Sequence, residues 1–434
     1  MSAALQFLLD LPAAHDAGQR RGLTSVCSAH PLVIEAALLE AAAHNAIALI
    51  EATCNQVNQD GGYTGMTPAG FRDYVLAIAD QIKFPMDRIL FGGDHLGPNP
   101  WRKLSASQAM DKAVVMTVAY ASAGFAKIHL DASMSCADDP SPLPAVTIAK
   151  RAAVLAAAAD AAAKVNNLPP PAYIIGTEVP VPGGAAEEIE RLEVTSPAGA
   201  AETIAIHEKA FESAGLQEAF DRSIGLVVQP GVEFGHANII HFDPAGARDL
   251  SLWRDDKGGI VFEAHSTDYQ TAAALSALVD EGFAILKVGP GLTFALREAL
   301  YGLDQIAGLI CEGYDAGTLP ETMEKIMMAA PDHWQDYYHG SATEQYINRH
   351  FSYSDRIRYY WTDPIAQSAV ERLLAVLDGT TIPETLISQF LPRQYAGAVN
   401  GHSTTARDLA IVAVRAALDP YSSACKNLGV PYDD

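Results

Sequence analysis

The sequence has few positive charges, few cysteines and no long apolar run. Lys and Arg number 29 against 52 Asp and Glu, and the net charge of −23 argues against nucleic acid or an anionic membrane as the main partner. The N-terminus has no basic segment followed by an apolar one, which predicts no signal peptide. The alanine-rich stretch 152–163 contains Asp160 and is followed by Lys164, so we expect a helix there and not a membrane span.

The cysteines are odd in number, widely spaced and without a Cys-x-x-Cys pair: Cys27, Cys54, Cys136, Cys311 and Cys425. This pattern argues against a disulfide framework and a thiolate zinc site, and it predicts reduced thiols in a cytoplasmic protein. Cys27 and Cys54 fall on predicted strands, where we expect core residues and not nucleophiles.

Short β-rich runs alternate with helical patterns between about residues 22 and 310. There are eight such runs, at 23–28, 47–53, 89–91, 127–131, 173–179, 224–229, 261–265 and 284–288. This alternation predicts a (β/α)8 TIM barrel. A doubly wound sheet also alternates strand and helix, but it gathers its polar groups at one switch point, whereas here polar residues end nearly every strand.

The rest of the chain flanks this barrel. We expect an N-terminal arm or helix over residues 1–21, the barrel over 22–310, a helical extension over 311–418 and a loose tail over 419–434. The loop 180–197 is predicted to be either a lid or a partner surface.

The stretch Gly92-Gly93-Asp94-His95-Leu96-Gly97-Pro98 closes the third strand and places a carboxylate beside an imidazole. In a TIM barrel the chemistry lies at the carboxyl ends of the strands. Ionisable or polar residues predicted at those ends are His30, Glu51, Asp94, His95, His129, Asp131, Glu178, Gln229, His265, Asp268 and Lys287. Because each charge costs several kcal/mol to bury alone, we expect them to contact one another, a metal or a substrate at one mouth. His129 and Asp131 share a strand face and could instead form a structural pair beneath it.

Several segments in strand order resemble the zinc-dependent class II ketose-bisphosphate aldolases. They are Asp94-His95, Ile128-His129-Leu130-Asp131-Ala132-Ser133, Gly176-Thr177-Glu178, His265-Ser266-Thr267 and Lys287-Val288-Gly289. Within that superfamily the chain is similar to the non-catalytic (Z-type) subunit family of D-tagatose-1,6-bisphosphate aldolase, through Ser28-Ala29-His30-Pro31, the segment 51–59, the segment 92–98 and Leu391-Pro392-Arg393-Gln394-Tyr395.

The resemblance implies a site for zinc or another divalent metal. His95 and His265 resemble two of its ligands, and the third should follow strand six, where His236 fits best. His241 is the alternative there, and Glu233 could be an additional ligand. Three neutral imidazoles suit zinc and leave a position open for substrate oxygens.

The resemblance also implies catalytic carboxylates and a substrate pocket. Asp94 resembles the group that moves the proton of the C4 hydroxyl, and Asp131 and Glu178 complete the predicted catalytic set. The predicted substrate-binding or phosphate-binding residues are Ser266, Thr267, Asp268, Lys287, Gly289, Gly291, Glu51 and His30. Backbone N–H groups at the start of the helix near Thr293 would favour an anion.

Three functions follow from this interpretation. The first is an accessory subunit that stabilises a catalytic tagatose-bisphosphate aldolase partner. The second is a metal-dependent ketose or ketose-phosphate 4-epimerase or aldolase, and the third is a sugar-phosphate-binding barrel without turnover; a homo-oligomer is left open. The tagatose-6-phosphate kinase chemistry attached to some family members is not expected, because the sequence has neither a GxGxxG nor a GxxxxGK[ST] loop.

Overall fold

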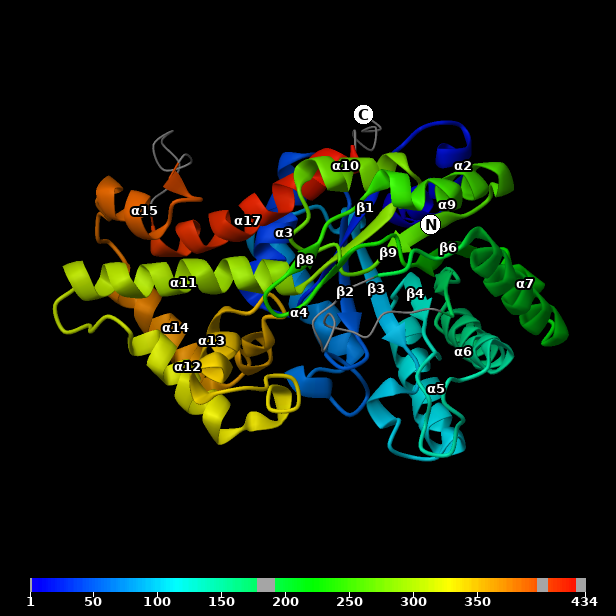
Figure 1. Cartoon of the computed structure of the whole chain (residues 1–434), viewed down its shortest axis with the longest axis horizontal. Helices are drawn as coiled ribbons and strands as arrows, with labels where there is room; N and C mark the ends of the chain where they lie inside the picture. The colour runs from blue at the N-terminus through cyan, green and yellow to red at the C-terminus, as the bar shows by residue number, and fades with distance from the viewer. Residues whose placement is uncertain (1, 178–191, 396–404, 427–434) are drawn as a thin grey trace.

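The eight predicted strands close into one parallel barrel, and β1 pairs with both β2 and β10 (Figure 1). The computed structural model of the chain describes residues 2–177, 192–395 and 405–426. The barrel strands are β1 (Leu23–Cys27), β2 (Ala48–Thr53), β3 (Ile89–Leu96), β4 (Lys127–Leu130), β5 (Ala172–Ile175), β6 (Ser223–Val228), β9 (Val261–Ala264) and β10 (Ile285–Val288). The TIM barrel prediction is therefore confirmed.

Helices follow these strands on the outside of the barrel. They are α3 (Pro31–Ala43), α4 (Pro68–Gln81), α5 (Ala106–Ser122), α6 (Ala145–Val165), α7 (Pro197–Ser213), α8 (Gln217–Phe220), α9 (Pro244–Lys257), α10 (Ala272–Asp280) and α11 (Pro290–Ile310). Their starts carry the expected signals: Thr67 accepts from the Gly70 N–H ahead of a proline at the first position of α4, and Ser105 accepts from Gln108 in α5.

The inside of the barrel is layered from bottom to mouth. Residues two apart on a strand point to the same face, so β2 presents Leu49 and then Glu51, and β4 presents Lys127 and then His129. The bottom layer is apolar and is closed by α1 (Ala3–Leu9), whose Leu5 and Leu8 pack in one cluster with the strand residues; α2 (Leu11–Asp16) follows. Charged side chains therefore occupy only the middle and the mouth.

The loop after β6 forms a small hairpin of β7 (Glu233–Phe234) and β8 (Ile239–Ile240). Short 3-10 turns occur at η1 (Gly62–Thr64), η2 (Met86–Arg88) and η3 (Asn99–Trp101).

The extension begins where α11 leaves the barrel, as Figure 1 shows on its left side. It contains α12 (Thr318–Ala329), η4 (Pro331–His333), α13 (Ala342–Phe351), η5 (Arg356–Tyr360), α14 (Pro364–Leu377), α15 (Glu384–Phe390) and α17 (Ala406–Cys425). Residues Pro331–His333 form a single 3-10 turn between α12 and α13.

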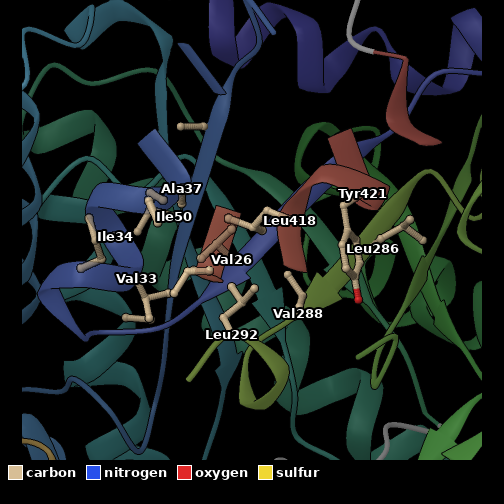
Figure 2. Packing of buried hydrophobic residues seen from close by; sticks show 14 of the residues in the cluster. Val26, Val33, Ile34, Ala37, Ile50, Leu286, Val288, Leu292, Leu418 and Tyr421 are labelled. Atoms are coloured by element: carbon tan, nitrogen blue, oxygen red, sulfur yellow. The ribbon is translucent and has the colours of Figure 1, made fainter. Parts of the chain in front are cut away.

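The last described helix, α17, runs back to the barrel and packs against α3, α10 and α11. Figure 2 shows Leu418 and Tyr421 of this helix beside Val26, Leu286 and Val288 of the barrel strands. The loose tail that we expected from residue 419 is therefore wrong for residues 419–425, because their apolar side chains are buried against the barrel. Residues 427–434 lie outside the described part of the chain.

Within the described residues, no helix has both the length and the apolarity needed to cross a membrane.

Candidate active site

The backbone of β3 turns sharply where its two ionisable residues lie. His95 has φ 51°, and the β3–β4 register shifts between Gly93 and Leu96. This distortion lets Asp94 and His95, although adjacent in sequence, both face the mouth. Glycine is needed at Gly97, where a Cβ would overlap the carbonyl oxygen of Asp131. Strain of this kind is concentrated at functional sites.

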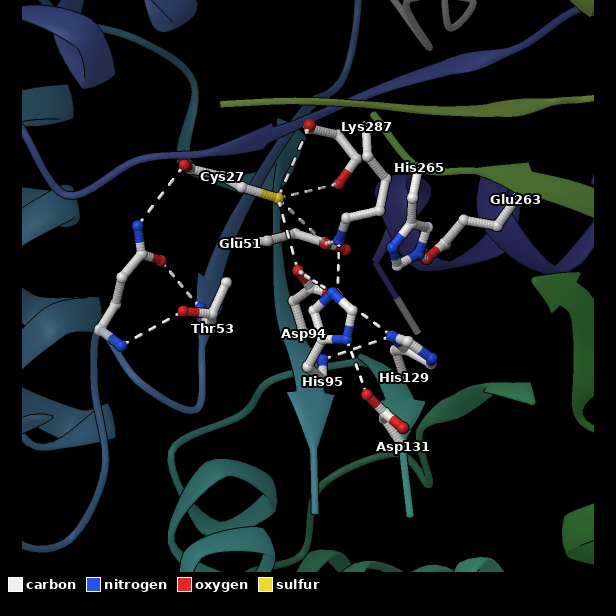
Figure 3. Close-up of polar contacts among 12 residues, drawn as sticks. Cys27, Glu51, Thr53, Asp94, His95, His129, Asp131, Glu263, His265 and Lys287 are labelled. Atoms are coloured by element: carbon white, nitrogen blue, oxygen red, sulfur yellow. Dashed lines mark hydrogen bonds and ion pairs between the residues drawn. The ribbon is translucent and has the colours of Figure 1, made fainter. Parts of the chain in front are cut away.

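Three buried imidazoles meet at the mouth of the barrel (Figure 3). The ring centroids of His95, His129 and His265 lie 4.9 Å, 4.9 Å and 5.2 Å apart. One ligand atom from each of them, together with one from Asp94, lies within 4.8 Å of the others. A group of nitrogen and oxygen donors this close fits a single divalent cation.

Each imidazole keeps one ring nitrogen available for a cation. Asp131 holds His95 Nδ1 at 2.8 Å, and Glu263 holds His265 Nε2 at 2.9 Å. His129 Nδ1 faces Asp94 Oδ1 at 3.1 Å, while its Nε2 is buried without a hydrogen-bond partner among the described residues. A buried unsatisfied nitrogen costs free energy unless a ligand reaches it, and carboxylates behind ligating histidines are typical of metal sites.

A layer of ion pairs lies directly beneath the histidines. Lys127 bridges Glu51 and Glu263 at 2.6 Å each, and Lys287 bridges Glu51 and Asp94, with 2.7 Å to Asp94. The four carboxylates of Glu51, Asp94, Asp131 and Glu263 exceed the two ammonium groups by two negative charges when the imidazoles are neutral. A divalent cation at the histidines would balance them.

The pKa values around the site agree with this charge distribution. Burial by itself would raise the pKa of Asp94, but His95, Lys287 and His129 lower it well below its usual range. Burial lowers the pKa of His265 to about 4, so its ring is neutral at pH 7. Burial also lowers the pKa of His95, but Asp94 and Asp131 outweigh it and raise the value overall. A metal would therefore compete with a proton at His95.

Replacing Lys127 by Met should destabilise the fold by about 3–5 kcal/mol, since it leaves two buried carboxylates without their shared cation. Chemical denaturation of both proteins measures the change. Lys112→Met is the matched control, because Lys112 forms an exposed pair with Asp60 and should cost less than about 1 kcal/mol. Equal losses in the two variants would contradict the structural role of this layer.

Replacing Asp131 by Ala should weaken metal binding by about 10–100-fold, because the carboxylate orients His95. Titration with a competing chelator measures the affinity. Ser133→Ala removes only the hydroxyl that donates to Asp131 at 2.6 Å, and it should have a smaller effect. An unchanged affinity in Asp131→Ala would contradict this positioning role.

The structure does not bring His236, the predicted third ligand, to the histidine group. The β7–β8 hairpin carries it to the extension, where Nδ1 lies 3.0 Å from Ser354 Oγ and Nε2 lies 3.1 Å from the Tyr337 carbonyl. His241 is exposed, and Glu233 bonds the Phe234 N–H at 3.0 Å with a pKa raised by burial to about 7. His129 of β4 takes the place expected of His236, because β4 lies next to β3 in the barrel.

The predicted substrate residues divide into three groups. Those lining a pocket above the histidines are Ser266, Asp268, Lys287 and Gly289, together with Asp94, His95 and His265. Those buried elsewhere are Glu51, in the ion layer, and Thr267, whose hydroxyl donates to the Lys287 carbonyl at 2.7 Å. In the third group, His30 caps α3 and lines a neighbouring cavity, and Gly291 donates its N–H to Asp268 at 2.7 Å. Glu178, which was predicted as a catalytic residue, lies outside the described residues.

The sequence interpretation missed several pocket residues. Arg358 and Tyr359 come from η5 of the extension, and Tyr63 comes from the loop after β2. Cys27, expected in the core, lines the pocket with its Sγ 3.8 Å from Asp94 Oδ2. No spacing in the sequence points to Arg358, because its position depends on how the extension packs on the barrel.

Known proteins match this sequence along nearly its whole length. A family model described as D-tagatose-1,6-bisphosphate aldolase subunit GatZ/KbaZ-like matches residues 8–426. A D-tagatose 6-phosphate 4-epimerase of Agrobacterium fabrum is 53% identical over 98% of this chain and 99% of its own length. The D-tagatose-1,6-bisphosphate aldolase subunit GatZ of Salmonella typhimurium is 49% identical over 96% of this chain and 98% of its own. A crystal structure of a probable tagatose 6 phosphate kinase from Sinorhizobium meliloti has 58% identity and a TM-score of 0.87, covering 93% of this chain and 100% of that one.

Proposed function

The chain belongs to the GatZ/KbaZ-like family of D-tagatose-1,6-bisphosphate aldolase subunits, and we propose that it is itself a metal-dependent 4-epimerase of ketose phosphates. The observation that carries the proposal is the group of three imidazoles beside Asp94 in a pocket at the barrel mouth. The 53% identity to a protein named as a tagatose 6-phosphate 4-epimerase supports it.

His95, His129 and His265 would hold the metal, for which we propose zinc because the donors are neutral imidazoles. When bound, the cation supplies Lewis-acid stabilisation of the negative charge that develops on the ketose oxygens. Asp131 and Glu263 keep two of the imidazoles in the tautomer and orientation that ligation needs.

Asp94 is the proposed proton acceptor. Its low pKa keeps it ionised at neutral pH, with the Lys287 ammonium group 2.7 Å away. It takes the proton of the C4 hydroxyl, the O4 electrons form an aldehyde, and the electron pair of the C3–C4 bond moves toward the C2 carbonyl. When the aldehyde presents its other face, the bond forms again with inverted configuration at C4 and the proton returns to O4. Release of the aldehyde fragment instead would be aldol cleavage.

The proposal is tested by incubating the zinc-loaded protein with tagatose 6-phosphate and following fructose 6-phosphate by an enzyme-coupled assay. We expect interconversion in both directions, with loss of activity in a chelator and recovery on adding zinc. Protein that binds zinc and sugar phosphate but catalyses no interconversion would instead be a binding barrel without turnover.

A second function, that of an accessory subunit for a catalytic class II tagatose-bisphosphate aldolase, is supported by the family match and by relatives that carry the subunit name. Co-expression with such a partner should raise the partner's soluble yield and aldolase activity. The Asp94→Asn variant separates the two functions, since it should support the partner as well as the parent protein does.

We also propose that the protein acts in the cytoplasm, where its five cysteines, none of which forms a disulfide, would stay reduced.

A further inference from the structure

Arg358 lines the active-site pocket and forms no direct ion pair within the described structure, although the charges of Asp355 and Asp268 act on it from farther away. Lys287, the other cation lining the described part of the pocket, is paired with Glu51 and Asp94. Within the described chain, no carboxylate oxygen lies within 4 Å of the Arg358 guanidinium, and its partners are the carbonyls of Ser354 and Asp355 and the Tyr359 hydroxyl. These accept three of its five N–H groups, so two remain for a ligand.

The position of Arg358 is fixed by its surroundings. The Tyr359 hydroxyl lies 2.8 Å from its Nη2, and the Tyr359 ring packs against those of Tyr63 and His333, with centroids 4.9 Å away in both cases. A half-buried, oriented guanidinium with free donors is suited to bind a phosphate through two parallel hydrogen bonds.

Arg358 also lies where two cavities meet. It lines the pocket above the histidines and a second cavity bounded by Ser28, Thr293 and Trp361, and Cys27, Gln56 and Tyr63 line both. A sugar held at the histidines could therefore extend its far end past Arg358 into the second cavity.

The N-terminus of α11, where we expected a phosphate, is already occupied by a carboxylate of the chain. Asp268 Oδ1 accepts the N–H groups of Gly289 at 2.9 Å and Gly291 at 2.7 Å. Asp268 is 2% exposed, and it lines the same pocket as Arg358. Its carboxylate uses the donors that would bind a phosphate and repels a second anion nearby.

We propose that the pocket accepts a ketose with one phosphate, bound by Arg358, and that Asp268 excludes a second phosphate from the start of α11. This inference rests on the proposed epimerase function for its reaction. It deepens that function by assigning the recognition of one phosphate to Arg358 and the exclusion of a second phosphate to Asp268.

The Arg358 part is tested with Arg358→Met, measured by calorimetric binding and by turnover. We expect its Kd and KM for tagatose 6-phosphate to rise on the order of 100-fold, whereas kcat/KM for unphosphorylated tagatose should fall by a few fold at most. Arg358→Lys should restore part of the affinity. Arg393→Met is the control for net charge, because that side chain is 63% exposed and pairs with Glu298 outside this pocket.

The Asp268 part is tested with tagatose 1,6-bisphosphate as a competitor. Asp268→Asn removes the charge and keeps an oxygen for the two N–H groups, whereas Asp268→Ala removes both. Affinity for the bisphosphate should rise about tenfold or more in the alanine variant and less in the asparagine variant, with the melting temperature recorded to confirm folding. Bisphosphate that binds the parent protein as tightly as tagatose 6-phosphate would overturn this part.

The epimerase function and the assignment of Arg358 to the phosphate can be refuted independently of each other. A parent protein that binds tagatose 6-phosphate through Arg358 but never converts it would refute the epimerase function and support the phosphate assignment. An active parent protein whose Arg358→Met variant loses affinity equally for tagatose and tagatose 6-phosphate, or for neither, would overturn the phosphate assignment alone.

Discussion

His129→Ala is expected to weaken zinc binding on the order of 1,000-fold and to abolish epimerase activity at micromolar zinc. The substitution removes one of the three imidazoles and the buried Nε2 that has no hydrogen-bond partner in the described structure. Metal content after dialysis, and affinity from a chelator competition at fixed pH, measure the effect.

The matched control is His236→Ala, which removes the histidine that the sequence favoured as the third ligand. It should keep parent zinc affinity, since that ring contacts Ser354 and the Tyr337 carbonyl on the extension. It should cost stability instead, seen as a lower melting temperature. The reverse outcome, with zinc lost in His236→Ala and kept in His129→Ala, would overturn the assigned ligand set.

Asp94→Asn should lower kcat on the order of 1,000-fold while the protein keeps its zinc. The amide cannot accept the C4 hydroxyl proton, and general-base groups contribute about 100–10,000-fold. The three imidazoles remain to hold the metal, and Lys287 keeps its pairing with Glu51. Steady-state rates and metal analysis on the same sample separate the two effects.

Asp60→Asn is the control for this variant, because Asp60 is half exposed and pairs with Lys112 on the surface. Its kcat should equal that of the parent protein. Full activity in Asp94→Asn would show that Asp94 does not accept the C4 hydroxyl proton. Loss of both zinc and activity would show instead that Asp94 is a metal ligand.

The barrel could be predicted from the sequence because its strands are marked locally. Apolar runs of four to eight residues alternate with helices that have their own caps, and a polar residue follows nearly every strand. The backbone distortion at His95 could also be predicted, because the pair Gly92-Gly93 precedes it and the pair Gly97-Pro98 follows it. Each of these signals depends on neighbours in the chain.

The third imidazole and the phosphate-binding residue could not be found in this way. His129 and His236 both lie near strand ends, and only the β7–β8 hairpin, which turns His236 toward Ser354, decides between them. Arg358 reaches the pocket through the packing of η5, far along the chain from β10. Such placement depends on long-range packing, which has no local pattern.

The return of α17 to the barrel affects how the protein can be synthesised. The Cys425 carbonyl accepts the N–H of Gly22 beside the first strand, and the Tyr421 hydroxyl donates to Thr267 at 2.6 Å. A ribosome adding 5–20 residues per second needs on the order of ten seconds between completing β10 and completing α17. During that interval the apolar surfaces of α3, α10 and β1 that α17 later covers are exposed, so we expect the nascent chain to be most prone to aggregation after its eighth strand is made.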